Sequence, residues 1–155
     1  MKGKQLLLTI FTLILFLPLS VTAGDFVQNP APEKFRDMAF GASLESLTDL
    51  VPVPKAGYKD TYYRKDEKLT FGQADILSVA YYFRKDRLYR VGVAFEGETN
   101  YFLIKDKLIR DFGPGRAVGA RYGWMWPEFS MEINYDASRH QGGLYYTYEG
   151  KPQDG

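Results

Sequence analysis

The sequence predicts an α+β fold, in which a single antiparallel meander sheet of about six to seven strands has two helices packed on one face. Apolar and polar residues alternate over residues 58–95 and again over 121–148, and a period of two is typical of half-buried strands. A segment with helical spacing of apolar residues precedes each interval, so the expected order is helix, strands, helix, strands. Aromatic residues form 16% of the chain and favour a half-buried sheet.

The first helix is expected near the beginning of the folded region. Apolar residues recur at helical spacing from Leu44 to Val51, and Ser43 is a residue type that caps helix N-termini. Pro52 and Pro54 cannot donate the backbone hydrogen bonds that a helix needs, so the helix is expected to end before them.

Strands are expected next at residues 58–64 and 69–71, followed by a long hairpin of residues 76–83 and 88–95. We expect a three-residue turn at 85–87, because a two-residue turn would mix the two faces of the hairpin. In this register the core face carries Leu77, Val79, Tyr81 and Phe83 with Tyr89, Val91, Val93 and Phe95. The opposite face, which is polar enough to meet water or a partner, carries Ser78, Ala80, Tyr82 and Arg84 beside Leu88, Arg90, Gly92 and Ala94.

The second helix has the clearest signals. It is expected to begin at Thr99 or Asn100, both competent N-caps, and to end at Phe112, before Gly113 and Pro114. Its apolar residues recur at helical spacing, so one side of the helix should lie against the sheet.

Three further strands are expected after this helix, at residues 121–126, 129–135 and 144–148. Pro127 and Glu128 are expected to form the turn between the first two of them. A longer polar loop should then lead to the last strand.

Residues 1–23 have the layout of a cleavable secretory signal peptide: two lysines, an apolar run, and small residues before the expected cleavage site. We therefore expect an exported protein that works in the periplasm, with secretion from the cell as the alternative. A retained membrane anchor is disfavoured, because Pro18 and Ser20 interrupt the apolar run. The chain has no cysteine for a lipid anchor or a disulfide, so no stable membrane insertion is expected after cleavage.

The remainder of the chain divides into three parts. Residues 24–34 are expected to form an extended lead-in, because they are rich in proline and lack periodicity. Residues 35–148 are expected to form a single α+β domain, which is long enough to bury a core without disulfides. Residues 149–155 form a polar C-terminal tail.

The charge pattern gives no support to a nucleic-acid partner. The whole chain has 20 basic and 19 acidic residues, and removal of the two signal-peptide lysines leaves 18 basic and 19 acidic residues. Basic and acidic residues alternate along the chain and do not form a block that could follow a phosphate backbone.

The chain is similar to a group of small exported bacterial domains in motifs spread over most of its length after residue 34: Phe35, Met38-Ala39-Phe40-Gly41-Ala42-Ser43-Leu44-Glu45, Asn100-Tyr101, Phe112-Gly113, Trp126 and Tyr135. More distantly, the order of helices and strands resembles the β-lactamase-inhibitor-protein fold and the small lipoprotein of the outer-membrane β-barrel assembly machine. The resemblance implies a fold and a protein that binds others through its surface, but it implies no functional residue. The lipidated cysteine of that lipoprotein is absent.

Candidate catalytic and metal-binding groups are sparse in the sequence. His140 is the only histidine and lies in a predicted loop, and the chain has no Gly-x-Ser-x-Gly motif. With one histidine and no cysteine, a zinc site is not expected. Carboxylates that could form a hydrolytic pair are Asp60, Asp66, Glu67, Asp75, Glu128 and Glu132, and their spacing selects no pair.

Three aromatic residues, Tyr122, Trp124 and Trp126, should share one face of a strand, where they could stack on a sugar ring. We interpret them as core residues instead, because the next strand alternates apolar residues in the same way.

These patterns predict a non-enzymatic binding module of the cell envelope, with no cofactor and no metal. Its partner is expected to be a protein or a cell-envelope ligand bound at the outer sheet face, around Tyr82, Arg84 and Arg90, because tyrosine and arginine are enriched in binding hot spots. Two alternatives remain open: a small-ligand carrier whose aromatic pocket includes Trp124 or Trp126, and an envelope hydrolase that uses an unidentified carboxylate pair.

Overall fold

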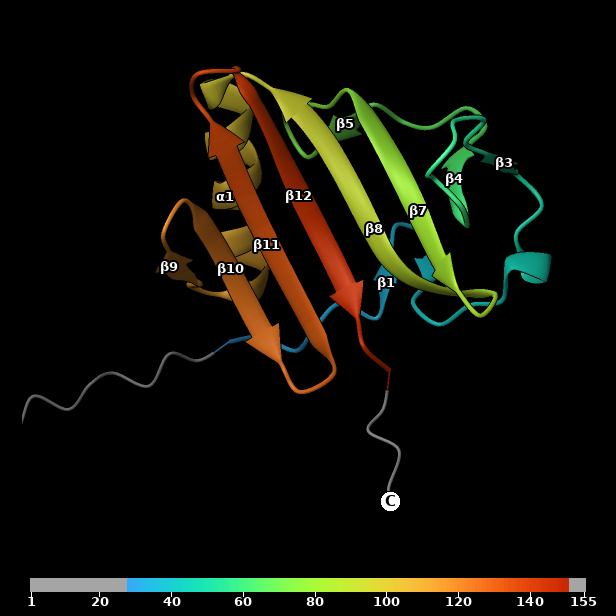
Figure 1. Cartoon of the computed structure of the whole chain (residues 1–155). Helices are drawn as coiled ribbons and strands as arrows, with labels where there is room; N and C mark the ends of the chain where they lie inside the picture. The colour runs from blue at the N-terminus through green and yellow to red at the C-terminus, as the bar shows by residue number, and fades with distance from the viewer. Residues whose placement is uncertain (1–27, 151–155) are drawn as a thin grey trace, which may run out of the picture.

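A computed structural model describes residues 28–150, which are mostly β structure: 47% strand and 15% helix. The expected signal peptide, the first four residues of the lead-in and the last five residues of the tail lie outside this range. Eight antiparallel strands form one sheet (Figure 1), in the order β3 (Leu50–Pro52), β4 (Thr61–Arg64), β7 (Ser78–Arg84), β8 (Arg87–Glu96), β12 (Gln141–Tyr148), β11 (Phe129–Asp136), β10 (Arg121–Trp126) and β9 (Arg116–Val118). Two small hairpins, β1 (Lys34–Phe35) with β2 (Met38–Ala39) and β5 (Thr70–Phe71) with β6 (Ala74–Asp75), lie outside this sheet.

The sheet consists of two halves that are successive along the chain. Strands β3, β4, β7 and β8 form the first half, and β9 to β12 form the second. The helix α1 (Glu98–Phe112) connects the halves, and β12 then pairs with β8, from Gln141 opposite Glu96 to Thr147 opposite Arg90. The three strands expected after the helix are confirmed, within one residue for β11 and with an earlier start for β12.

The predicted α+β fold, with two helices on a meander sheet of six to seven strands, is wrong. The described residues are mostly β, with one α-helix and an eight-stranded sheet, and the sheet is not a meander because β12 lies beside β8. The segment expected as the first helix contains only a 3-10 turn, Leu44–Ser46, followed by β3. A helix this short gains few hydrogen bonds for the residues it orders. The backbone of the segment bonds to the β7–β8 hairpin instead, with Leu44 N donating to Asp86 O at 2.9 Å and Leu88 N donating to Ala42 O at 3.0 Å.

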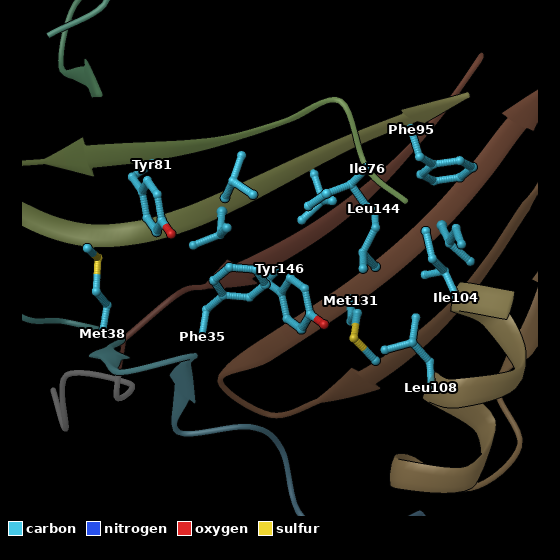
Figure 2. Close-up of a cluster of buried hydrophobic side chains, with 14 of the residues drawn as sticks. Phe35, Met38, Ile76, Tyr81, Phe95, Ile104, Leu108, Met131, Leu144 and Tyr146 are labelled. Carbon is cyan, nitrogen blue, oxygen red and sulfur yellow. The ribbon is translucent and has the colours of Figure 1, made fainter. Parts of the chain in front are cut away.

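The β1–β2 hairpin takes the place of the missing helix. Its buried side chains, Phe35 and Met38, cover the part of the inner sheet face that α1 does not reach, as Figure 2 shows. The Phe35 ring packs edge-on against Tyr81 at 6.2 Å and Tyr146 at 5.3 Å between ring centroids. The helix covers the other part of this face with Ile104 and Leu108, both completely buried (Figure 2).

The helix α1 begins slightly earlier than expected. Its N-cap is Gly97, in a left-handed conformation with φ 85°, and not Thr99 or Asn100. Asn100 lies inside the first turn, where its side chain donates to Glu96 O at 2.9 Å and accepts from Asp75 N at 3.1 Å. The helix ends at Phe112 and Gly113, as predicted.

The β7–β8 hairpin has a two-residue turn, and the predicted three-residue turn is wrong. Lys85 and Asp86 both have positive φ, 50° and 59°, as a type I′ turn requires. A β-bulge at Tyr89 adds one residue to β8, so the faces do not mix: Tyr82 pairs with Arg90, and Phe83 pairs with Leu88.

The bulge changes two assignments at the turn end of the hairpin. Leu88, expected on the outer face, is buried in the core, whereas Tyr89, expected in the core, is half-buried outside it. Leu77 precedes β7 and is 52% exposed, so its expected place in the core is also wrong. The core assignments that are confirmed are Val79, Tyr81, Phe83, Val91, Val93 and Phe95.

Candidate functional site

The outer sheet face, opposite the helix, brings the three predicted binding residues close to one another. Tyr82 on β7 lies directly opposite Arg90 on β8, and Arg84 lies at the end of β7. The neighbouring strand β12 adds Tyr145, which pairs with Gly92 of β8. We call these four residues and Tyr89, which stacks with Arg84, the outer cluster: Tyr82, Arg84, Tyr89, Arg90 and Tyr145.

Gly92 leaves the space in which two rings of the outer cluster lie. A Cβ atom at residue 92 would be only 3.2 Å from the Tyr145 ring and 3.3 Å from the Tyr82 ring. Such distances are shorter than ordinary van der Waals contact between carbon atoms. The glycine therefore allows the rings of Tyr82 and Tyr145 to lie close to the sheet backbone.

Two arginines of the outer cluster lie over aromatic rings. The Arg90 guanidinium carbon is 4.6 Å from the Tyr145 ring centroid, and that of Arg84 is 4.3 Å from the Tyr89 ring centroid. Stacking of this kind orients a guanidinium while its in-plane N–H groups can still bind an acceptor. Within residues 28–150, the buried Nε of Arg90 has no hydrogen-bond partner, and Arg84 has only a long, exposed ion pair with Glu149 at 3.7 Å.

Tyr82 of the outer cluster has a raised pKa. Burial raises the pKa of Tyr82 above its usual 10.0, the nearby Tyr145 acts in the same direction, and Arg90 opposes both. A neutral phenol can both donate and accept a hydrogen bond. The cluster thus contains two guanidinium groups and three tyrosine hydroxyls.

Sequence reasoning placed Tyr82, Arg84 and Arg90 on this face but missed the other members of the outer cluster. Tyr145 was missed because the position of its strand beside β8 depends on a pairing between distant segments. The alternation along the last strand, with Leu144 and Tyr146 buried, does put Tyr145 on the opposite face. Tyr89 was missed because the bulge was not foreseen.

A second candidate site is a cleft of about 500 Å³ at the end of the sheet where β10 turns into β11. Its aromatic lining consists of Phe40, Trp126, Phe129 and Tyr148. The Phe129 ring lies edge-on to Phe40 at 4.9 Å and to Trp126 at 6.0 Å. Residues 31–33 of the lead-in also line the cleft.

The core interpretation of the three aromatic residues of β10 holds fully for Trp124 and partly for the others. Trp124 is buried, with its indole N–H donating to Gly113 O at 2.8 Å. Tyr122 and Trp126 are half-buried against the core. Trp126 also lines the cleft and donates its indole N–H to Asn29 O at 2.9 Å.

Charged side chains on the inner side of β4 are held together by ion pairs. Arg64 pairs with Asp37 and Asp49, and its Nη2 donates to Asp37 Oδ2 at 2.7 Å. This hydrogen bond holds the pKa of Asp37 below its usual 3.8. Nearby, the enclosed carboxylate of Glu67 is paired with Arg36 and accepts a hydrogen bond from the Tyr81 hydroxyl at 2.6 Å.

The groups that could perform hydrolysis lie in different environments. Asp66 and Glu67 line one pocket together with two arginines. Hydrogen bonds from Arg64 and Ser138 lower the pKa values of Asp37 and Asp136 respectively. A general acid needs the opposite shift. His140 is exposed on a turn, where its Nδ1 is 3.5 Å from the Tyr135 hydroxyl oxygen. In the described part of the chain, no three histidine or acidic side chains form a group that could hold a metal ion.

Comparison with known proteins finds no matching family model, no similar curated protein and no similar solved structure. The resemblance to small exported domains and to β-lactamase-inhibitor-like folds therefore stays a prediction. Between residues 28 and 150, no helix is long and apolar enough to cross a membrane.

Proposed function

We propose that the protein is an exported, non-enzymatic binding module of the cell envelope, and that it binds a protein or envelope ligand through the outer cluster. The observation that supports this proposal is the stacking of Arg90 on Tyr145 beside Tyr82. Arginine and tyrosine are the residue types that dominate binding energy at interfaces. An arginine already held by a ring loses less conformational freedom when it binds.

The partner should offer acceptor atoms to the outer face. The Arg90 guanidinium, stacked on Tyr145, forms no ion pair within residues 28–150, and the ion pair of Arg84 with Glu149 is exposed and weak. A carboxylate or a row of carbonyl oxygens could replace that weak pair and bind both guanidinium groups.

The test begins with capture of a partner from the envelope fraction of the native host, followed by titration of the purified partner. The variants are Tyr82→Ala and Arg90→Ala, with Arg139→Ala as a control, since Arg139 is a 78% exposed side chain outside the cluster. Removal of a hot-spot residue is expected to weaken binding by about 30-fold, whereas the control should bind normally. Unchanged affinity in both cluster variants, with their stability preserved, would exclude this surface.

The aromatic cleft favours a second candidate function, that of a small-ligand carrier. Four aromatic side chains line a space of about 500 Å³, a size typical of small-molecule sites. A ligand in the cleft would change the fluorescence of Trp126, and the change should disappear in Trp126→Phe while Trp124 remains. A ligand-induced change that persists in Trp126→Phe would place the ligand elsewhere.

A further inference from the structure

We infer that the aromatic cleft binds an organic cation, of the quaternary ammonium class; this inference rests on the second candidate function. Aromatic faces attract such cations electrostatically, and they also bury the methyl groups that surround the charge. The cleft is lined by three half-buried rings, those of Phe40, Trp126 and Tyr148, and by the buried ring of Phe129.

The charge of the cleft is complementary to a cation. Among the residues that line it, the only charged side chains are Glu33 and Glu128, and both are acidic. Neither glutamate takes part in an ion pair formed within residues 28–150. An anionic ligand would meet two unneutralised carboxylates here, whereas a cation would be attracted by both.

The side of the cleft formed by the lead-in is held in place by hydrogen bonds. Asn29 donates its backbone N–H to Phe112 O at 3.1 Å and its side-chain N–H to Asp111 O at 2.7 Å. Asn29 O accepts from the Trp126 indole at 2.9 Å. These bonds attach the lead-in both to the end of α1 and to β10, so the cleft is formed before any ligand arrives, and binding requires little ordering.

The test compares choline with 3,3-dimethylbutan-1-ol, a neutral compound of the same shape, by calorimetric titration of the purified protein. Choline is expected to bind about tenfold more tightly, and its advantage should decrease at high salt. The double variant Glu33→Gln/Glu128→Gln should lose about tenfold in choline affinity and keep its affinity for the alcohol. Glu98→Gln, an exposed glutamate at the start of α1 and away from the cleft, should match the wild type.

Each outcome decides between the inference and the function on which it rests. Equal affinity for both compounds would overturn the cation inference and leave the cleft as a site for neutral ligands. Absence of binding by either compound, with a folded protein, would overturn the inference as well. If no small molecule in a screen changes the fluorescence of Trp126, the carrier function itself is excluded.

Discussion

Tyr81 combines a core position with a polar function. Its side chain is completely buried, yet its hydroxyl donates to Glu67, whose carboxylate pairs with Arg36. Arg36 also donates to the backbone carbonyl oxygens of Lys68 at 2.6 Å and Thr70 at 3.1 Å. One arginine therefore connects the β1–β2 hairpin to residues 67–70, which lead from β4 into β5.

Removal of this arginine should destabilise the fold. In Arg36→Met, the Glu67 carboxylate, only 9% exposed, would lose its cation, and the free energy of unfolding should decrease by about 3 kcal/mol. Urea denaturation measures the change. Adding Glu67→Gln to this variant should restore part of the loss, because the remaining group is neutral. A loss below about 1 kcal/mol would mean that water replaces the arginine at little cost.

Alkaline pH should reveal the burial of Tyr81. Burial raises the pKa of Tyr81 from 10.0 to about 12, so the folded state keeps a proton that the unfolded state releases. The resulting stabilisation is fully present below pH 10 and is lost as the pH rises toward 12. Across that interval, wild type should lose about 2–3 kcal/mol more stability than Tyr81→Phe in denaturant titrations. Parallel pH curves for the two proteins would contradict the assignment.

In the β7–β8 hairpin, the two-residue turn and the bulge must act together to keep the core residues on the inner face. A two-residue turn alone would place Val91, Val93 and Phe95 on the outer face, and the bulge at Tyr89 returns these three residues to the inner face. The bulge also moves Tyr89 to where Arg84 can stack on it. The same irregularity thus preserves the core and builds part of the outer cluster.

The turn type can be tested by substitution. The positive φ angles of Lys85 and Asp86 are unfavourable for these residue types. Asparagine followed by glycine is the pair that type I′ turns favour. Lys85→Asn/Asp86→Gly should therefore raise the free energy of unfolding by about 1 kcal/mol in urea denaturation. A decrease in stability would argue for a longer turn. Binding through the outer cluster should not change, because neither residue belongs to it.

Periodicity in the sequence located the longer strands but not β3 or β9, and not the arrangement of the strands in the sheet. Alternation correctly identified the buried residues of β7 and β11 and most of those of β8, because each signal lies within one strand. Helical spacing over residues 44–51 was misleading, since so short a segment follows its tertiary hydrogen bonds and not its propensity. The outer cluster was only partly predictable, because Tyr145 reaches it through the pairing of β12 with β8.

In the whole molecule, the pairing of β8 with β12 joins the two halves of the sheet. Gly142 lies in this seam opposite Phe95. A Cβ atom at residue 142 would approach the Phe95 ring at 2.2 Å and Asn134 O at 2.7 Å. The seam therefore has no room for a side chain at this position, and the core ring of one half depends on the backbone of the other.

Gly142→Ala should destabilise the whole domain. The overpacked methyl group would displace Phe95, with an expected loss of about 3 kcal/mol in the free energy of unfolding. Gly119→Ala is the control: its site is open, and only its φ of 58° disfavours alanine, at about 1 kcal/mol. Tryptophan fluorescence and circular dichroism should report one coincident unfolding transition for both variants. Separate transitions would show that the halves fold independently.

The position of β12 in the middle of the sheet has a consequence for biosynthesis. One edge of β8 stays without its neighbour until residues 141–148 have been made, because that neighbour is the last of the strands within residues 28–150. The described sheet cannot be completed while the ribosome still holds residues 141–148. A nascent chain that stops before residue 141 therefore exposes the unpaired edge of β8.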